Sequence, residues 1–270
     1  MSARIAALPM YDFAELRGAH DALWFALADA LVDSGLSNVP SHLTRDLAHQ
    51  DVWRHPSLLF GQACEYPIAK SFGSLLTLVA TPRYSAEGCE GACYRSAIIV
   101  RTHDAAETLA GFRDRRCVVN ELDSNSGMNL LRAAVAPLAD GTRFFQSVHL
   151  SGSHRQSVEM VAGHEADIAA IDCVTFAHLR KLYPALVDKV RILCWTPRSP
   201  SLPFVTASST DAQTLDTLRS VLADVITDSS LRSARDRLFL DGVDLQPDAR
   251  LSRLLQLERG ATALAYPALA

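Results

Sequence analysis

Apolar and polar positions follow two different rhythms along this chain. Stretches in which apolar residues recur every three or four positions predict amphipathic helices, whereas short apolar runs rich in Val, Ile and Leu predict buried strands. The chain is predicted to begin with a strand at Ile5–Leu8, which Pro9 ends, and a long helix at about Phe13–Val32, which Gly35 ends. The apolar face of this helix comprises Leu16, Ala19, Leu23, Leu27, Ala30 and Leu31.

The next part of the chain reads as short strands separated by turns and a glycine-rich loop. Strands are predicted at Leu58–Gly61, Leu75–Ala80 and Tyr94–Arg101. Gln62–Tyr66 is predicted to be the turn after the first of these strands, and Arg83–Cys93 the loop before the last.

From Thr102 onward, short strands and helices alternate regularly. The predicted strands are Cys117–Asn120, Phe144–Leu150, Ile168–Ile171 and Val190–Trp195. The predicted helices are Ala105–Phe112, Gly127–Ala136, Ser153–Ala162 and Cys173–Leu182. Such alternation is typical of an α/β fold with a parallel sheet.

A proline-rich stretch, with Pro197, Pro200 and Pro203, marks a boundary after this regular region. The segments predicted beyond it are a strand at Phe204–Ala207 and helices at about Asp211–Thr227, Ser230–Phe239 and Arg250–Glu258. The sequence therefore predicts two lobes. Residues 102–190 form an inserted α/β lobe, and residues 1–101 plus 191–270 form a discontinuous first lobe.

Composition narrows the classes of partner. The chain has 270 residues, of which 49% are hydrophobic, and a formal net charge of −4 with no run of Lys or Arg. This charge disfavours binding to nucleic acid or to an acidic membrane surface, so an anion site in this chain must be made locally by helix ends and a few donors.

No apolar run reaches the length of a membrane-spanning helix, which is about 18 residues, so no membrane insertion is expected. The first residues also lack the long apolar segment of a signal peptide. The expected location is cytoplasmic as the chain stands, or periplasmic if a leader was trimmed before Met1.

Six cysteines are present, and they fit a reducing compartment better than an oxidising one. Cys117, Cys173 and Cys194 lie in apolar runs and read as buried thiols. Cys89 and Cys93, separated by Glu-Gly-Ala, are candidates for a redox pair or half of a metal site, although their spacing is not Cys-x-x-Cys. The histidines show no metal-ligand spacing, so no metal and no cofactor are predicted.

Two strand-to-helix turns carry the candidate chemistry. The first is Ser124-Asn125-Ser126-Gly127, and the second, after the next strand, is Gly152-Ser153-His154. The start of a helix exposes unpaired N–H groups and partial positive charge, which suits a small oxyanion, and the hydroxyls add donors. The simpler interpretation is that both turns are ordinary helix caps.

Two further side chains have alternative interpretations. Ligands of open α/β sheets lie beyond the carboxyl ends of the strands, so both turns are expected to line the cleft between the lobes. His154 is then either a ligand donor or a merely exposed residue. Asp172, which opens the helix after Ile168–Ile171, is either a plain N-cap or a residue of the cleft.

The order and spacing of several stretches resemble a known family. These stretches are Leu8-Pro9-Met10-Tyr11, Gln62-Ala63-Cys64-Glu65-Tyr66-Pro67, Tyr94-Arg95-Ser96-Ala97-Ile98-Ile99-Val100, Asp123-Ser124-Asn125-Ser126-Gly127, Gly152-Ser153-His154 and Ala170-Ile171-Asp172. The chain resembles phosphate-, phosphite- and phosphonate-binding proteins of the periplasmic-binding-protein type II class, the substrate-binding components of ABC importers. The resemblance implies a bilobal α/β fold around a ligand cleft.

The resemblance also implies a set of ligand-binding residues. The first turn is expected to hold phosphoryl oxygens, His154 to donate to the same oxygens, and Tyr94 to reach them from the other lobe. The predicted ligand-binding residues are Tyr11, Gln62, Tyr66, Tyr94, Ser124, Asn125, Ser126, Gly127, Ser153, His154 and Asp172.

Two positions depart from the family pattern. Asn125 stands where the family has a hydroxyl, and its amide still donates although it is bulkier. Glu65 stands where the family has Gly in the Gln62 stretch, and a carboxylate beside an anion repels it unless it binds an amine or points away.

The function implied is capture of a small oxyanion such as phosphate or phosphonate, with a small anionic ligand and an ABC permease as partners and no catalytic residue. Ser126, His154 and Asp172 are the residue types of a nucleophilic triad, but Gly-x-Ser-x-Gly is absent and their order differs from that of the α/β hydrolases. The alternatives are a cytoplasmic enzyme on the same fold, of lyase or pyrimidine-biosynthesis type with Glu65 or Asp172 as base, and a ligand sensor.

Overall fold

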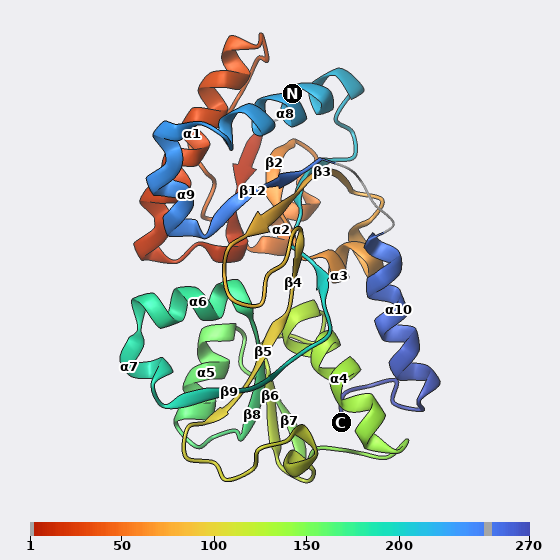
Figure 1. Ribbon diagram of the computed structural model, residues 1–270. Coiled ribbons are helices and arrows are strands. Elements are labelled where there is room, and N and C mark those ends of the chain that lie inside the picture. Colours follow the sequence, from red (N-terminus) through yellow and green to blue (C-terminus); the bar gives the residue numbers. More distant parts are fainter. Residues whose placement is uncertain (1–2, 246–249) are drawn as a thin grey trace. The chain divides into compact units, whose positions relative to one another are not determined.

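The computed structural model describes residues 3–245 and 250–270, which form two compact units (Figure 1). Unit 1 comprises Met1–Ser85 and Pro200–Asp248, and unit 2 comprises Ala86–Ser199 and Ala249–Ala270. Each unit contains its own five-stranded sheet. The chain therefore has a bilobal α/β fold, and none of its described helices is long and apolar enough to cross a membrane.

The sheet of unit 1 has the strand order β1-β2-β11-β3-β12. Its strands are β1 (Ile5–Ala7), β2 (Leu58–Gln62), β3 (Leu76–Tyr84), β11 (Phe204–Ala207) and β12 (Leu240–Asp244). β1 and β2 are parallel, whereas β11 is antiparallel to both β2 and β3, and β12 is antiparallel to β3. The sheet is therefore mixed.

Helices pack against this sheet, because packing removes their apolar faces and the apolar side chains of the strands from water. They are α1 (Arg17–Asp33), α2 (His49–Arg54), α3 (Glu65–Pro67) with a π-helical turn at Ile68–Phe72, α8 (Ala212–Val225) and α9 (Arg232–Leu238). α1 packs against α8 and α9. Its fully buried Trp24 lies stacked on Phe60 of β2, with ring centroids 6.1 Å apart.

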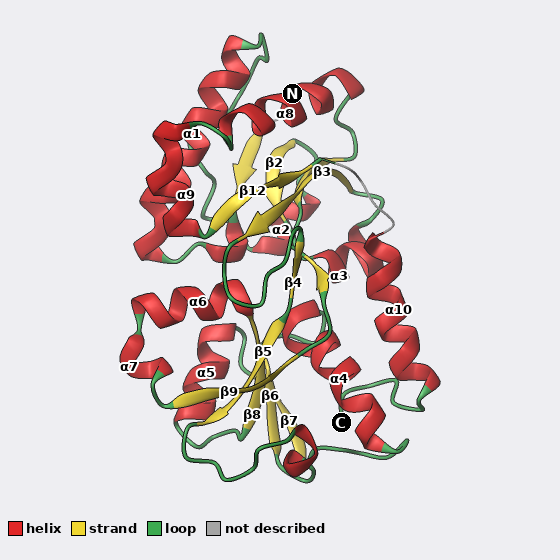
Figure 2. Cartoon of the chain, in the orientation of Figure 1, coloured by secondary structure: helices red, strands yellow, loops and turns green. Residues whose placement is uncertain are grey.

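The sheet of unit 2 has the strand order β7-β6-β8-β5-β9 (Figure 2). Its strands are β5 (Ser96–Arg101), β6 (Arg116–Val119), β7 (Ser147–Leu150), β8 (Ile168–Asp172) and β9 (Val190–Trp195). β6, β7 and β8 are parallel, but β5 is antiparallel to β8 and to β9. The expectation of a parallel sheet thus holds for β6, β7 and β8 and is wrong for β5, which runs antiparallel to both of its neighbours.

The helices of unit 2 are α4 (Leu130–Ala139), α5 (His154–Ala162), α6 (Cys173–Leu182), α7 (Pro184–Val187) and α10 (Arg250–Ala263). Figure 1 shows α10 beside α4, and the two helices are in contact. The C-terminal helix therefore belongs to unit 2 and not to the first lobe. β4 (Cys93–Tyr94), in the same unit, precedes β5.

The boundaries of the units differ from those predicted from the sequence, which gave residues 102–190 to the second lobe. The strands β5 and β9, at residues 96–101 and 190–195, are hydrogen-bonded members of the second sheet. A strand that is hydrogen-bonded to a sheet belongs to that sheet. The boundaries between the two units therefore fall after Ser85 and after Ser199. Tyr94 consequently lies in unit 2, whereas the sequence placed it in the other lobe.

The helix predicted at Ala105–Phe112 does not form, and only a 3-10 turn at Leu109–Phe112 is present. Asp104 Oδ1 accepts from the Ala106 N–H at 3.0 Å, which is a local alternative to a helical turn. Arg191 donates to the carbonyls of Asp104 and Ala106, at 3.1 and 2.6 Å. The Arg191 guanidinium therefore binds two carbonyls that would accept the first hydrogen bonds of a helix.

The strands β7 and β3 differ most from their predicted lengths, and β12 was not predicted. β7 begins only at Ser147, because the Phe144 and Phe145 N–H groups donate to the Ala270 carbonyl. β3 continues through Pro82 to Tyr84, because it pairs with β12. β12 lies in a segment predicted to be nearly all helix, and its pairing with β3 overrides the poor strand propensity of its Asp and Gly residues.

Candidate functional site

The two predicted turns lie next to each other at the carboxyl end of the second sheet. β6 and β7 are parallel neighbours, so the chain leaves both strands in the same direction. Beyond the strands the pairing continues, since Ser151 N–H donates to Val119 O and Gly152 N–H to Asn120 O, each at 3.0 Å. Gly152 has a φ of +86°, a backbone conformation that residues with a side chain rarely adopt.

The first turn is a tight helical start. Ser124 is the N-cap, and its Oγ accepts from the Gly127 N–H at 3.0 Å. A π-helical turn at Asn125–Asn129 then leads into α4. A Cβ on Gly127 would lie 1.8 Å from Asn120 Oδ1, so any side chain at this position would displace the Asn120 side chain or the turn.

The second turn starts α5 and meets the first turn through side chains. Ser153 is the N-cap of α5, and its Oγ accepts from the Gln156 N–H at 3.2 Å. His154 is the first residue of the helix, and its Nε2 lies 2.7 Å from Ser126 Oγ. The hydroxyl of one turn and the imidazole of the other therefore form one hydrogen-bonded pair.

Burial controls the charge of His154. The residue as a whole is only half-buried, but the Nδ1 atom of its ring is enclosed. This desolvation disfavours the imidazolium and lowers the pKa of His154 to about 4. The ring is therefore neutral at neutral pH, and it holds a single N–H to donate.

Nδ1 of His154 has no hydrogen-bond partner within the part of the chain that the structure describes. A nucleophilic triad requires a carboxylate that orients this nitrogen. Ser126 and His154 thus lack the third member, and Asp172 does not supply it. The pair is suited to donating hydrogen bonds rather than to activating a nucleophile.

Asn125 orients the groups around the first turn. Its Nδ2 donates to Tyr94 OH at 2.9 Å and to Ser199 Oγ at 2.8 Å, while its Oδ1 accepts from Asn129 Nδ2 at 3.0 Å. Both amide hydrogens are used inside the protein, so Asn125 positions two hydroxyls at this turn. Tyr94 and the first turn are thereby brought together within unit 2.

Ser199 is a residue of this site that the sequence analysis missed. It is fully buried, and its hydroxyl accepts from Asn125, 74 residues earlier in the chain. It lies between Arg198 and Pro200, in the proline-rich stretch that the sequence analysis interpreted only as the boundary after the regular α/β region. No local signal marks it, and only the tertiary pairing shows its role.

A buried arginine lies behind the first turn. Arg132 is 4% exposed, and its Nη2 donates to Asn129 Oδ1 at 2.8 Å. Its Nη1 donates to the Pro267 carbonyl at 2.7 Å, and Glu258 Oε1 of α10 is 3.8 Å away. The guanidinium fixes Asn129, and through it the orientation of the Asn125 amide.

Asp172 caps α6, because its Oδ1 accepts from the Thr175 N–H at 2.9 Å. This confirms the N-cap interpretation of that residue. A contact of Asp172 with a ligand stays a prediction.

The predicted residues of the first lobe have roles inside unit 1. Gln62 Nε2 donates to Tyr84 OH at 2.8 Å and to the Leu202 carbonyl at 3.1 Å. Tyr11 is buried edge-on against Tyr84, with ring centroids 5.5 Å apart. Tyr66 is also buried, with the Lys70 ammonium 5.8 Å from its ring centroid. Their contacts with a ligand stay predictions.

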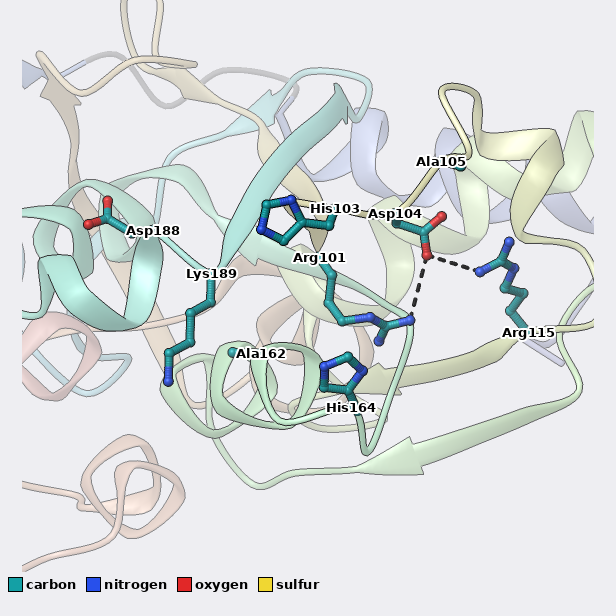
Figure 3. Close-up of a pocket in the computed structure, with 9 residues that line it drawn as sticks. All are labelled: Arg101, His103, Asp104, Ala105, Arg115, Ala162, His164, Asp188 and Lys189. Carbon is teal, nitrogen blue, oxygen red and sulfur yellow. Dashed lines mark hydrogen bonds and ion pairs between the residues drawn. The ribbon is translucent and has the colours of Figure 1, made fainter.

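A pocket of about 720 Å³ lies at the other end of the second sheet. Its lining residues, shown in Figure 3, are Arg101, His103, Asp104, Ala105, Arg115, Ala162, His164, Asp188 and Lys189. Figure 3 shows Arg101 and Arg115 converging on Asp104, at 3.6 and 3.0 Å. Arg101 also pairs with Asp167 at 2.8 Å, so these two guanidinium charges are balanced within the protein.

This pocket lies at the amino ends of β6 and β8, because Val100 of β5 pairs with Ile168 at the start of β8. Ligands of such sheets bind beyond the carboxyl ends, where the two turns lie. The turns are therefore the better candidate site. No group of three or more His, Cys, Asp or Glu residues suited to a metal is present among the described residues.

The chain has the bilobal α/β fold of periplasmic binding proteins of type II. The family model for periplasmic phosphonate substrate-binding proteins of ABC transporters matches residues 59–249. The chain belongs to this family, whose members are transport proteins and not enzymes. The family thus agrees with the resemblance and does not favour the lyase or pyrimidine-biosynthesis alternative.

Solved structures share the fold at low sequence identity. XAC2383 from Xanthomonas citri bound to ATP aligns with a TM-score of 0.71 at 16% identity, over 97% of this chain and 98% of its own. PhnD1 from Prochlorococcus marinus in complex with methylphosphonate aligns with a TM-score of 0.74 at 13% identity, over 96% and 98%.

The periplasmic aliphatic sulphonate binding protein SsuA from Escherichia coli aligns with a TM-score of 0.64 at 14% identity, over 97% and 87%. No protein among the curated sequences matches this chain. At these identities the likeness to solved structures establishes the fold alone.

Proposed function

We propose that this protein binds the phosphorus oxyanion of a small ligand at the two joined turns of unit 2 and presents that ligand to an ABC permease. The observation that carries the proposal is the 2.7 Å contact between Ser126 Oγ and His154 Nε2, which brings the starts of two helical segments together. Membership of the phosphonate-binding family supports both the ligand class and the transport partner.

Two helix starts give the site its preference for an anion. The helical segment that begins at Asn125 and the helix α5 each expose first-turn N–H groups and a partial positive charge at their N-terminal ends. An oxyanion at these ends is stabilised without any cationic side chain in contact with it. This fits a chain whose net charge is −4.

The side chains add directional donors. We assign the hydroxyls of Ser124 and Ser126 and the imidazole of His154 to the oxyanion. The Ser153 hydroxyl donates to Gln156 Oε1 at 3.1 Å, and its contact with a ligand stays a prediction. Asn125 and Gly127 shape the turn, and Tyr94 and Ser199 are positioned by the Asn125 amide. A tetrahedral phosphorus group accepts several such hydrogen bonds at once, each strengthened by its charge.

The neutral state of His154 matters for this role. With a pKa of about 4, the ring enters the complex with one N–H. A dianion placed against it favours the imidazolium and raises the pKa, so binding is expected to take up a proton. The site therefore adapts its charge to its ligand.

The relatives support a phosphorus oxyanion over other anions. PhnD1 is described with methylphosphonate and XAC2383 with ATP, and both compounds carry phosphorus bonded to several oxygens. SsuA is described as a sulphonate-binding protein, so sulfonates are the appropriate competing class. We place the protein in the periplasm, where its family acts.

A ligand panel tests the proposal. Methylphosphonate, 2-aminoethylphosphonate, phosphate, phosphite, ATP, methanesulfonate and acetate are to be screened by thermal shift and calorimetry. At least one phosphorus compound should raise the melting temperature, since a ligand at 100 times its Kd stabilises by about 2.7 kcal/mol. His149→Ala is the matched control, because His149 lies on β7 and is exposed.

Binding of a phosphorus compound that Ser126→Ala weakens and His149→Ala preserves supports the assignment. Binding of sulfonate or acetate alone refutes the ligand class. Binding that Ser126→Ala leaves unchanged places the site elsewhere. Steady conversion of a panel member into product contradicts the transport function.

A further inference from the structure

Two cysteines that are 84 residues apart in sequence meet inside unit 2. The Sγ atoms of Cys89 and Cys173 are 3.3 Å apart, which is hydrogen-bonding contact between thiols. The sequence suggested Cys93 as the partner of Cys89. Cys93 instead forms an antiparallel bridge with Glu90 through the backbone, and Cys173 supplies the thiol beside Cys89.

The contact is held from both sides by backbone structure. Cys173 is the first residue of α6, and its N–H donates to the Arg95 carbonyl at 3.2 Å. Cys89 lies in a turn in which its N–H donates to the Ala86 carbonyl at 3.0 Å. These two backbone hydrogen bonds fix the main chain at both cysteines.

Gly88 allows this close approach. Its φ is +97°, and a Cβ at this position would lie 2.6 Å from the Trp195 ring and 3.0 Å from Cys173 Cβ. Glycine is therefore required where the loop backbone packs against Cys173. The ion pair between Arg180 of α6 and Glu87, at 3.2 Å, ties the same loop to the same helix.

We propose that Cys89 and Cys173 form a disulfide that fastens the loop 86–93 to the start of α6. The oxidant is a disulfide compound, either a thiol oxidase protein or a small molecule. One cysteine sulfur attacks the oxidant disulfide and releases one thiol, and the second cysteine then attacks the mixed disulfide and releases the other. The two cysteines lose two electrons and two protons, and the oxidant disulfide gains them.

The surroundings of the two thiols give the order of these steps. Cys89 is partly exposed, whereas Cys173 is buried. The hydrogen bond with Cys89 and burial both raise the pKa of Cys173, so it stays a thiol until its partner is oxidised. Cys89 is therefore the residue that meets the oxidant, and Cys173 resolves the mixed disulfide.

The location of the protein's family supports this chemistry. Disulfides form and persist in the bacterial periplasm, and the family acts there. The bond would close a long loop that includes both turns of the candidate site, because residues 124–127 and 152–154 lie between Cys89 and Cys173. Its main effect is to restrict the unfolded chain.

Peptide mapping tests the pairing on the intact protein. The reduced protein is incubated with oxidised glutathione, alkylated and cleaved after Lys and Arg. The expected product links residues 84–95, which contain Cys89 and Cys93, to residues 156–180, which contain Cys173. Cys93→Ser should keep this cross-link, and Cys89→Ser and Cys173→Ser should each abolish it.

Three outcomes would overturn the proposal. The first is a bond confined to residues 84–95, which would pair Cys89 with Cys93. The second is a glutathione adduct at Cys89 that Cys173 does not displace. The third is recovery of all six thiols after the treatment, counted under denaturing conditions.

A melting experiment gives an independent readout. Reduction should lower the melting temperature of the oxidised wild-type protein and of Cys93→Ser by roughly 5–10 °C. It should have no effect on Cys89→Ser. Equal melting temperatures for the oxidised and reduced wild-type protein would contradict a bond that stabilises the fold.

Discussion

His154 and Ser126 are the two residues of the proposed site that join its two turns, and both side chains are uncharged at neutral pH. Each residue alone is a common helix-start residue, and the sequence left open whether the turns were only caps. In the structure the caps are separate residues, Ser124 and Ser153, whereas Ser126 Oγ and His154 Nε2 face each other at 2.7 Å. The cap interpretation therefore explains Ser124 and Ser153, and it does not explain Ser126 and His154.

The burial of His154 predicts a specific pH dependence for the ligand-free protein. Its pKa falls from 6.5 to about 4 on folding, so the unfolded chain binds a proton between these pH values that the folded chain does not. His154 therefore does not reduce the free energy of unfolding above pH 6.5. As the pH falls from 6.5 toward 4, its burial lowers that free energy by up to about 3 kcal/mol. Denaturant unfolding at a series of pH values measures this.

His154→Gln should flatten the profile between pH 6.5 and 4, and His149→Gln should leave it as in the wild type. Asp167 titrates in a lower window, because its ion pairs with Arg116 and Arg101 hold its pKa well below 3.8. Its stabilisation is lost only as the pH falls below 3.8. A wild-type profile that is flat from pH 6.5 to 4 would contradict the burial of His154.

The residue types of the site were predictable, and some of their roles were not. Helix-start chemistry alone points to Ser124, Ser126 and His154. Asn125 was predicted to donate to the ligand, yet its two amide hydrogens are used by Tyr94 and Ser199, which lie 31 and 74 residues away. Such pairings depend on the assembled sheet, and no local pattern contains them.

The first turn is the element on which the site depends. Its backbone passes so close to Asn120 that a Cβ on Gly127 would overlap Asn120 Oδ1. Gly127→Ala should therefore move the turn, destabilise the protein by about 1–3 kcal/mol and weaken ligand binding. Gly18→Ala is the matched control, because no atom lies within 4 Å of that added Cβ in α1.

Gly18→Ala should leave binding intact and stabilise the protein by up to about 1 kcal/mol. Chemical denaturation and calorimetry on both variants give the comparison. Wild-type stability and affinity in Gly127→Ala would show that Asn120 moves away freely and that the turn is not under this constraint.

The sequence pattern predicted correctly the helices and strands whose ends depend on neighbouring residues in the chain. α6, β9 and β11 have the predicted bounds, since apolar runs and a following proline or polar residue define them. The helix predicted at Ala105–Phe112 is wrong, because Arg191 draws on its carbonyls from a distant strand. β12 was missed for the same kind of reason, since only its pairing with β3 makes it a strand.

For the whole molecule, the family resemblance predicted the bilobal fold, and the family match confirms it. The membership of strands and of the last helix in each unit was not predictable from the pattern. The sequence of a strand such as β5 or β9 predicts a strand but does not say which sheet it joins, because this depends on its hydrogen-bond partners. The pattern of α10 predicts an amphipathic helix, and its contacts with α4 and with the turn at Asn125–Asn129 assign it to unit 2.

This assignment predicts that the C-terminal helix stabilises the unit that holds the site. Leu254 of α10 is fully buried, so Leu254→Ala should destabilise the protein by about 2–5 kcal/mol. Leu264 is 48% exposed, and Leu264→Ala should change stability by no more than about 0.5 kcal/mol. Thermal and denaturant unfolding measure both, and equal effects of the two variants would contradict the packing of α10 in unit 2.

The account rests on the claim that the two turns form one oxyanion site, and a double-mutant cycle tests it most directly. Calorimetry with the best phosphorus ligand of the panel is to be carried out on the wild type, Ser126→Ala, His154→Ala and the double variant. Each single change should weaken binding about tenfold to a hundredfold, since each charge-assisted hydrogen bond contributes roughly 1.5–3 kcal/mol.

The double variant should lose less than the product of the two single effects, because the two residues share a ligand and a hydrogen bond. Circular dichroism spectra like that of the wild type establish that the variants are folded. Wild-type affinity in both folded single variants, or strictly multiplicative losses in the double variant, would contradict a single site made by both turns.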